Sequence, residues 1–341
     1  MPVDVDDSSQ APLTAQLEHW AREHISADAA VRDVSAMPGN SGVSSGFSVH
    51  VTGETIRRFV IRMAPVGVAR RGNTDVLRQV PLLRCLEDQG IPVASLVWFT
   101  DDPRWFGTDV IIQDWVDGRP LHMTDSSGSV MSALTDETLV LHAVDTLTDV
   151  HRVDWSALLD DWAVVETVDV GVSRWLRVLR AAPHEDIAHH GEQLASSLLT
   201  RRPEDVRVGL YHGDYQTNNI LYDVDGKVKA VVDWEIAGIG SMAVDLGWLS
   251  IMTDSSCWGP EHAMKMLVTV GPETIRTRYT RSIPLSSSDF QWFRAYAAFS
   301  YASIASYNLR LHRTGKRRDP IYEDVASSIP TLIDFGLTAI S

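Results

Sequence analysis

The stretch Leu210-Tyr-His-Gly-Asp-Tyr-Gln-Thr-Asn-Asn-Ile-Leu221 and the segment Val231-Val-Asp-Trp-Glu235 that follows it decide the fold of this chain. A short apolar run reaches Tyr211, and Gly213 then supplies a position at which the backbone can turn sharply. Asp214 is therefore predicted to lie on a loop directly after a strand.

A β-hairpin is predicted to follow this loop. Residues Asn219–Tyr222 and Lys227–Val232 have the pattern of two strands, and the Asp225-Gly226 pair between them is a strong turn signal. An antiparallel hairpin brings its two open ends together, so Asn219 and Asp233 are expected to lie side by side. An amide oxygen and a carboxylate are hard oxygen ligands of the kind that Mg²⁺ prefers.

The spacing of Asp214, Asn219 and Asp233 is that of the base and the two magnesium ligands in kinase-type phosphoryl-transfer enzymes. Each residue alone has an ordinary explanation. A single His212 is more often a hydrogen-bonded core residue than a catalyst, and Asp225 is more often a turn former than a ligand. The coincidence of all the parts, in order, favours the functional interpretation.

The segments His212–Leu221, Val231–Gly240 and Val244–Trp248 resemble the aminoglycoside phosphotransferase family, above all its branch related to the kinase-like domains found with acyl-CoA dehydrogenases. The resemblance implies a protein-kinase-like α+β fold, in which a small N-terminal lobe with an antiparallel sheet precedes a mainly helical C-terminal lobe. It also implies transfer of the γ-phosphate of ATP, or of GTP, to a hydroxyl group of a small molecule. The likeness is most specific between Gly209 and Leu249 and extends, more loosely, from about Ala36 to the end of the chain.

The resemblance assigns roles to individual residues. Asp214 is implied to be the catalytic base, and Asn219 and Asp233 to hold Mg²⁺ on the phosphates. His212 and Asp245 are implied to support the catalytic loop.

A glycine-rich segment lies upstream, where the small lobe would begin. Residues Met37–Gly46 contain three glycines among small polar residues, and an alternating strand pattern starts at Phe47. Backbone N–H groups in such a loop can approach phosphate oxygens closely, so Gly42, Ser44 and Ser45 are candidate nucleotide contacts. A plain linker or hairpin is the alternative.

Arg62 ends a predicted strand at the place where a kinase has its phosphate-pairing lysine. Arginine can hold phosphate through two parallel hydrogen bonds, although an exposed charge at a strand end is the alternative. The helix that follows has Gln79 where an acidic partner is expected, with Asp75 and Glu87 as nearby substitutes. Because proline disrupts a helix interior, Pro81 predicts either a kink or a helix start at that residue.

The segment Val110–Gly118 has the pattern of a buried strand that runs into a polar turn. In the family this is the hinge between the lobes, so backbone groups from Gln113 to Val116 are expected to meet the adenine ring, with Gln113 and Trp115 as cofactor-binding candidates. A buried strand followed by an ordinary loop is the alternative.

Three regions are predicted. They are an N-terminal extension with a leading helix (1–27), a nucleotide-binding small lobe (28–116) and a catalytic, acceptor-binding large lobe (117–341). Glu235, Tyr301 and Arg310 are candidate acceptor-binding residues. The basic run 316–318 is either a contact for the phosphates of an acyl-CoA or a solvated turn between helices.

Composition excludes several classes of protein. The chain has 341 residues with a net charge of −15, which argues against nucleic acid as a partner. It has no apolar run long enough to cross a membrane, an acidic start unlike a secretory signal, and two cysteines, so a cytoplasmic monomer or homodimer is expected.

Three other functions stay open. A 4-hydroxyacyl-CoA kinase would differ only in its acceptor. A protein kinase is disfavoured, because the segment between Asp233 and Asp245 is too short for an activation loop. A catalytically silent nucleotide-binding protein is suggested by the Arg62 and Gln79 departures. A metal site at His184, His189 and His190 is less favoured than a solvated cluster.

Overall fold

The computed structural model describes residues 10–37, 43–125, 127–156, 162–181 and 185–341. The chain divides into two compact units, one up to Asp117 and one from Gly118. Each is described by itself below.

The first unit is built on one antiparallel sheet, in the order β1-β2-β3-β5-β4. Its strands are β1 (Ala30–Ala36), β2 (Val43–His50), β3 (Arg57–Met63), β4 (Leu96–Thr100) and β5 (Val110–Asp114). The helices of this unit are α1 (Gln10–His24), α2 (Gln79–Asp88) and α3 (Pro103–Phe106), with short 3₁₀ turns η1 (Gly72–Thr74) and η2 (Val76–Arg78).

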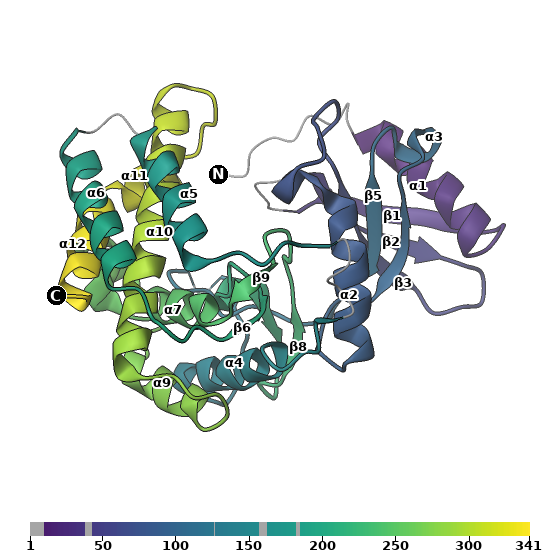
Figure 1. Ribbon diagram of the computed structural model, residues 1–341. Coiled ribbons are helices and arrows are strands. Elements are labelled where there is room, and N and C mark those ends of the chain that lie inside the picture. Colours follow the sequence, from purple (N-terminus) through teal and green to yellow (C-terminus); the bar gives the residue numbers. More distant parts are fainter. Residues whose placement is uncertain (1–9, 38–42, 126, 157–161, 182–184) are drawn as a thin grey trace. The chain divides into compact units, whose positions relative to one another are not determined.

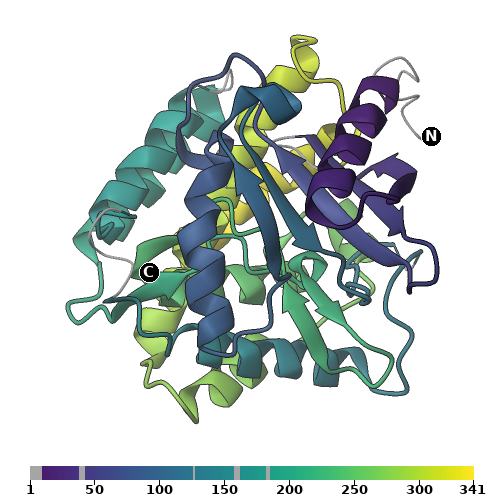
Figure 2. The same cartoon turned by 90° about the vertical axis from the view of Figure 1, so that its right-hand side faces the viewer.

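The two faces of this sheet have different covers (Figures 1 and 2). Alternate residues of the central strands, among them Phe59 and Ile61, form a buried cluster with Leu17 and Trp20 of α1. The leading helix predicted from the sequence is therefore present and covers one face. Helix α2 lies on the opposite face, which carries Arg62.

Two local expectations in this unit need correction. Strand β2 begins at Val43, so Ser44 and Ser45 are strand residues and not part of a loop; pairing with β1 and β3 outweighs their low strand propensity. Helix α2 begins at Gln79, and Pro81 is its third residue. The first N–H groups of a helix have no intrahelical acceptor, so Pro81 disrupts no hydrogen bond and produces no kink.

The second unit contains two small antiparallel sheets. Strand β6 (Val208–Tyr211) pairs with β9 (Gly238–Ser241), and β7 (Ile220–Tyr222) pairs with β8 (Val228–Val231) after the 3₁₀ turn η4 (Thr217–Asn219). The predicted hairpin is therefore confirmed, with Gly226 in its turn at φ 76°.

Helices make up the rest of this unit, and the long helix α10 is at their centre (Figure 1). Its inward residues form one core with helices α5, α6, α7 and α12. The helices are α4 (Asp136–Val150), α5 (Val168–Arg180), α6 (Glu185–Thr200), α7 (Ala243–Met252), α8 (Pro260–Lys265), α9 (Pro272–Thr280), α10 (Ser287–Arg313), α11 (Ile321–Ala326) and α12 (Ser328–Ala339), with a 3₁₀ turn η5 (Ser255–Cys257).

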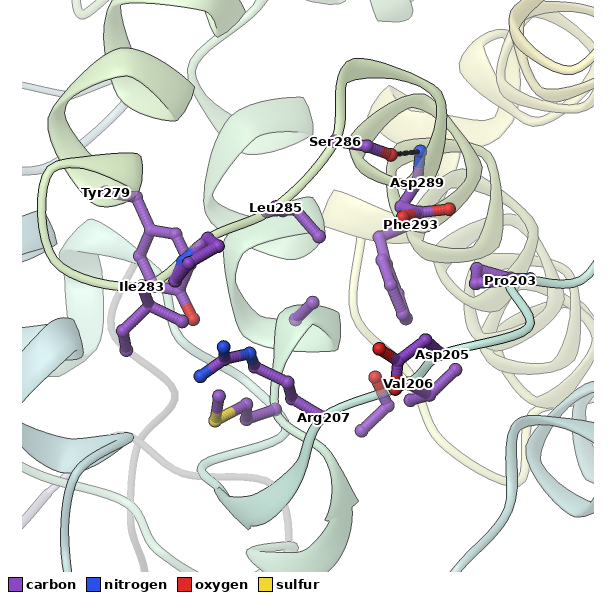
Figure 3. A pocket seen from close by; sticks show the side chains of 14 residues that line it. Pro203, Asp205, Val206, Arg207, Tyr279, Ile283, Leu285, Ser286, Asp289 and Phe293 are labelled. Carbon is purple, nitrogen blue, oxygen red and sulfur yellow. Dashed lines mark hydrogen bonds between the residues drawn. The ribbon is translucent and has the colours of Figure 1, made fainter.

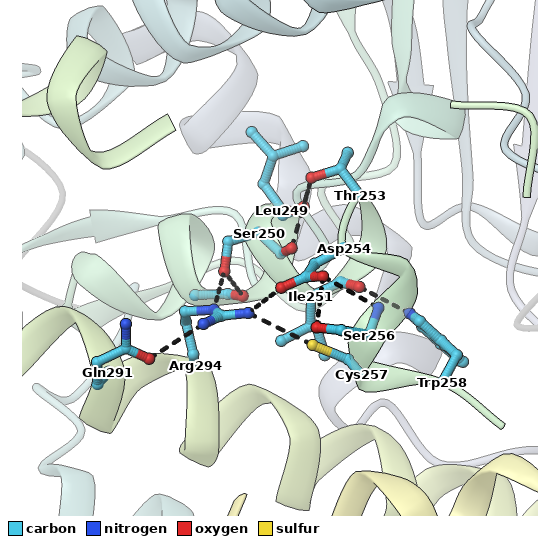
Figure 4. A network of polar contacts seen from close by, with 11 residues as sticks. Leu249, Ser250, Ile251, Thr253, Asp254, Ser256, Cys257, Trp258, Gln291 and Arg294 are labelled. Atoms are coloured by element: carbon cyan, nitrogen blue, oxygen red, sulfur yellow. Dashed lines mark hydrogen bonds and ion pairs between the residues drawn. The ribbon is translucent and has the colours of Figure 1, made fainter. Parts of the chain in front are cut away.

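A buried arginine ties three of these elements together (Figure 4). Arg294 of α10 forms an ion pair with Asp254 and donates hydrogen bonds to Ser250 Oγ at 3.2 Å and Gln291 Oε1 at 3.0 Å. Asp254 also accepts from the Ser256 amide at the start of η5. A buried charge is tolerated only when it is paired and hydrogen-bonded, so this network fixes α7, η5 and α10 in one arrangement.

None of the helices in the described residues is both long enough and apolar enough to cross a membrane.

Candidate active site

The loop after β6 turns at Gly213, as predicted. Gly213 has a φ of +90°, and a Cβ at this position would lie 2.9 Å from the carbonyl oxygen of Ile236. A side chain is therefore excluded both by backbone conformation and by space. The turn leaves Asp214 partly buried at the head of the loop.

Asp245 binds the backbone of this loop. Its buried carboxylate accepts the amide of His212 at 2.7 Å on Oδ2 and the amide of Gly213 at 2.8 Å on Oδ1. His151, at the end of α4, contacts Oδ2 through Nε2 at 3.3 Å, and its Nδ1 is 2.8 Å from the hydroxyl of Tyr279. Two backbone donors on one carboxylate fix the path of the loop.

The His212 ring connects the loop to the hairpin. Its Nδ1 accepts the amide of Asp214 at 3.2 Å, so Nε2 carries the proton that is donated to the carbonyl oxygen of Val232 at 2.9 Å. The ring also packs on Trp234, with centroids 4.6 Å apart. The carbonyl that His212 binds immediately precedes Asp233, so the loop and the end of β8 are held together.

Asp214 is oriented by two side-chain amides. Gln216 Nε2 donates to Oδ1 at 2.8 Å, and Asn219 Nδ2 donates to Oδ2 at 3.0 Å and to the Asp214 carbonyl at 2.9 Å. Burial raises the pKa of Asp214, and the neighbouring charge of Asp233 adds to the rise, whereas His212 and the two amides oppose it. A carboxylate with a raised pKa is a stronger base than an exposed one.

Asn219 and Asp233 lie side by side at the open end of the hairpin, as predicted. The Val232 amide donates to the carbonyl of Asn219 at 2.9 Å. The side-chain nitrogen of Asn219 donates to Asp214, so the side-chain oxygen of Asn219 points away from Asp214. Asp233 has a φ of +69°, a conformation that is uncommon for residues other than glycine.

The residues at this hairpin end fit Mg²⁺ better than a softer metal. They offer an amide oxygen from Asn219 and a carboxylate from Asp233, which are oxygen ligands of the kind that Mg²⁺ prefers. Within the described residues, no three His, Cys, Asp or Glu side chains form a metal site, so a cation here would take further ligands from phosphate or water. His189 and His190 lie on α6, and His184 is outside the described residues.

In the first unit, the sheet register sorts the nucleotide candidates by face. Ser44 pairs with Arg62, and Gly46 with Val60, so Ser44, Gly46 and Arg62 share the face on which α2 lies. Ser45 pairs with Ile61 and points to the α1 face. Gln79 is buried at the start of α2, and Gly42 is outside the described residues.

Several polar groups at the end of β5, which the sequence offers as nucleotide contacts, already form hydrogen bonds within the protein. Gln113 is buried and donates through Nε2 to the carbonyl of Ala94 at 3.0 Å, which is a structural bond. The amides of Asp114 and Trp115 are also occupied, whereas Val116 donates to no acceptor in the described part of the chain. The Trp115 ring lies over Gly46, where a Cβ would be 3.1 Å from it.

Tyr301 lies in an aromatic cluster close to the catalytic loop. Its ring is 5.7 Å from that of Trp248 and 4.9 Å from that of Trp258. Trp248 follows Asp245 by three residues on α7, so the two share a helix face. Burial raises the pKa of Tyr301 to about 12, and the charge of Asp214 contributes to this rise.

The other two acceptor candidates are placed differently. Arg310 lies nine residues after Tyr301 on α10, about 13 Å along the helix, and donates to the carbonyl of Ala181 at 2.5 Å. It therefore caps the end of α5. Glu235 is partly buried and directly follows Trp234 in the chain.

Sequence reasoning missed His151, Gln216 and Tyr279, and gave no role to Trp248. His151 ends an apolar helix and Tyr279 lies far along the chain, so neither carries a local signal. Gln216 lies inside the catalytic motif, and its position two residues after Asp214 was the only sequence signal of its contact with that carboxylate.

Comparisons with known proteins agree with this geometry. A family model described as the phosphotransferase enzyme family matches residues 38–269. Acyl-CoA dehydrogenase family member 11 of Pongo abelii is 25% identical over 313 residues, which cover 85% of this chain and 38% of that protein. The chain thus spans less than two fifths of the curated relatives that it matches.

Solved structures share the fold. A protein of Ralstonia eutropha JMP134, described as a candidate aminoglycoside phosphotransferase, aligns with a TM-score of 0.76 at 20% identity, over 96% of this chain and 98% of that one. An amicoumacin kinase in complex with AMP-PNP, Ca²⁺ and Ami aligns with a TM-score of 0.63 at 14% identity, over 96% and 93%. The predicted protein-kinase-like fold is confirmed.

Proposed function

Since this chain belongs to the phosphotransferase enzyme family, we propose that it transfers the γ-phosphoryl group of ATP to a hydroxyl group. The acceptor is a small molecule, as the family membership supports. The observation that carries this proposal is the bonding of Asp214, whose carboxylate is held by Gln216 and by Asn219 beside the end of β8. GTP has no support among the comparisons.

Asp214 is the proposed base. Its carboxylate accepts the proton of the acceptor hydroxyl while that oxygen forms the new bond to phosphorus and the bond from phosphorus to the leaving oxygen of ADP breaks. Gln216 and Asn219 hold the carboxylate in one orientation, which supports catalysis by positioning. Asn219 and Asp233 would hold Mg²⁺, which neutralises charge on the phosphates.

In the first unit, the proposed nucleotide contacts lie on the α2 face of the sheet. Ser44 and Arg62 are paired there, and Arg62 is proposed to bind phosphate with Gln79 as its partner. The Val116 amide is proposed to donate to the adenine ring, and Trp115 to border it. Gly42 is proposed to act through its backbone amide, whereas Ser45, which lies in the doubly paired strand β2, stays a weaker proposal.

On the acceptor side, Tyr301 and its aromatic neighbours are the proposed contacts. Trp248 Nε1 and the Tyr322 hydroxyl are buried and have no hydrogen-bond partner within the described residues. Buried polar atoms are normally bonded, so both are suited to a ligand oxygen. The proposed acceptor therefore has an apolar or planar part against the rings. Glu235 and Arg310 stay weaker proposals.

A hydroxyacyl-CoA is a second candidate acceptor. The observation that favours it is the similarity to proteins named acyl-CoA dehydrogenase family members. The exposed basic residues 316–318 would meet the phosphates of CoA. Competition of free CoA with phosphoryl transfer, and its loss when the three are replaced by Gln, tests this candidate.

The test of the proposed function is nucleotide turnover with an acceptor panel. Asp214→Ala is expected to reduce transfer by about 10²- to 10⁴-fold while ATP still binds. Asp225→Ala removes an exposed carboxylate from the same hairpin and is the matched control, with full activity expected. Asp233→Ala and Asn219→Ala are expected to raise the Mg²⁺ concentration needed for half-maximal rate.

Full activity in Asp214→Ala would refute the assignment of the base. Mg²⁺-dependent ATP binding by the natural chain, without transfer to any acceptor of the panel, would support a catalytically silent nucleotide-binding protein instead.

A further inference from the structure

The support of the catalytic loop extends past Asp245 to two residues that have no role so far, His151 and Tyr279. His151 Nε2 lies 3.3 Å from Asp245 Oδ2, and His151 Nδ1 lies 2.8 Å from the hydroxyl of Tyr279. His151 is the C-cap of α4, and Tyr279 belongs to α9. Both residues are buried, so these contacts join two helices to the loop away from water.

Hydrogen bonding around His151 selects one tautomer of the neutral ring. The Asp245 carboxylate accepts the amides of His212 and Gly213, so it is an acceptor toward His151 as well. Nε2 therefore carries a proton, which leaves Nδ1 of a neutral ring as an acceptor. Burial raises the pKa of Tyr279, so its hydroxyl keeps its proton and can donate it to Nδ1.

Helix α9 is held against α4 by a second contact, one residue before Tyr279. Arg278 donates from Nε to Asp145 Oδ1 at 2.7 Å and from Nη2 to Oδ2 at 2.5 Å, which is a bidentate pair. The Tyr279 ring itself borders a cavity of about 210 Å³, together with the end of β9 and the start of α10 (Figure 3). A ring beside a cavity lacks packing contacts on that side. The hydrogen bond to His151 is therefore its most direct link to the loop.

We propose that Tyr279 is a positioning residue for phosphoryl transfer, whose hydroxyl holds His151 as the neutral Nε2–H tautomer that orients Asp245. Without this hydroxyl, Nδ1 is a buried acceptor that has no donor among the described residues, so the ring turns or takes up a proton. Either response changes its contact with Asp245 and loosens the loop that carries Asp214. The effect on catalysis rests on the proposed function, whereas the effect on the loop does not.

The tautomer is tested by nitrogen NMR of the His151 ring in the full chain without nucleotide. An unprotonated Nδ1 and a protonated Nε2 are expected, and Tyr279→Phe is expected to shift the Nδ1 resonance. A proton on Nδ1 in the natural chain, or an Nδ1 resonance that is the same in both proteins, would overturn the proposal.

The effect on the loop is tested by amide hydrogen exchange. Tyr222→Phe is the matched control, because it also removes a buried hydroxyl bonded to α4, in this case to the carbonyl of Leu139 at 3.1 Å. Tyr279→Phe is expected to speed exchange of the His212 and Gly213 amides about fivefold or more, and the control less than about twofold. Equal acceleration in the two variants would reduce Tyr279 to a general structural role and overturn the proposal.

The effect on catalysis is tested by ATP turnover with the best acceptor of the panel. His151→Gln supplies one donor and one acceptor, as the neutral ring does, whereas His151→Leu supplies neither. The Gln variant is expected to keep kcat within about threefold, while His151→Leu and Tyr279→Phe lower it about tenfold at unchanged KM for ATP. A change in KM alone, or equal losses in the Gln and Leu variants, would contradict the positioning role.

The two proposals fail separately. Full activity of Asp214→Ala would refute the proposed base and leave the NMR and exchange results intact. Unchanged exchange in Tyr279→Phe, with an inactive Asp214→Ala, would refute the role of Tyr279 alone.

Discussion

The catalytic loop in the second unit and the candidate nucleotide face in the first are held in different ways. Around Asp214, each side chain is oriented by a hydrogen bond from its neighbours, and Asp245 fixes the backbone that carries them. Around Arg62, backbone pairing between the strands fixes which face of the sheet each residue occupies. The comparison teaches that the loop depends on side-chain hydrogen bonds for its path, whereas the strands take theirs from backbone pairing. Substitutions of side chains in the loop are therefore expected to cost more.

Asp245→Asn is expected to have the largest effect. Asparagine offers one acceptor oxygen, so either the His212 or the Gly213 amide would face an NH₂ group in a buried site. The expected loss is about 2–4 kcal/mol of unfolding free energy. Urea unfolding measures it, with Asp225→Asn on the exposed hairpin turn as the control. A loss below about 0.5 kcal/mol would mean that the loop does not depend on this carboxylate.

Gly213→Ala is expected to have the second-largest effect on stability. Its φ of +90° and the 2.9 Å approach to Ile236 both oppose a Cβ, so about 2–3 kcal/mol is expected. Thermal unfolding and phosphoryl transfer should fall together, because the turn also places Asp214. A folded, fully active variant would contradict the role of this turn.

Gly46→Ala tests the first unit. The added methyl group would be 3.1 Å from the Trp115 ring, but Gly46 has no left-handed backbone to strain. The expected cost is about 1 kcal/mol, with weaker ATP binding measured by calorimetry. Trp115→Phe in the same chain should recover part of this loss, because the shorter ring leaves room. Purely additive effects of the two changes would show that the contact is irrelevant.

Asp214→Asn is expected to have the smallest effect on stability, and of opposite sign. The Gln216 amide can rotate and present its oxygen to the new NH₂ group, whereas the backbone amides that bind Asp245 cannot. Burial raises the pKa of Asp214 in the folded state, so ionisation opposes folding once the pH rises above the unfolded value of about 3.9, and fully so above the folded pKa. The variant should therefore melt slightly higher than the natural chain at pH 7, with the difference shrinking toward pH 4. Thermal unfolding across this range measures it, and a lower melting temperature at pH 7 would contradict the sign.

The same comparison explains what could be predicted from sequence. The turn at Gly213 and the hairpin from Asn219 to Asp233 are local, and their signals lie in consecutive residues, so both were predicted correctly. The start of β2 was placed too late, because Ser44 and Ser45 have weak strand propensity and owe their conformation to neighbouring strands.

The parts that escaped prediction depend on distant residues. His151 meets Asp245 across 94 positions of the chain, and Tyr279 joins His151 across 128. The positive φ of Asp233 was also unforeseen, because aspartate at the end of an apolar strand gives no turn signal. Similarly, nothing local to Gln113 indicates that its side chain is already bound to Ala94.

The left-handed backbone of Asp233 bears on how an inactive variant of this protein would be detected. Glycine adopts that conformation without strain, and one base change converts an aspartate codon to a glycine codon. Such a variant would lose a proposed metal ligand, while its backbone would adopt the same conformation without strain. The abundance of such a variant would therefore be a poor guide to its activity.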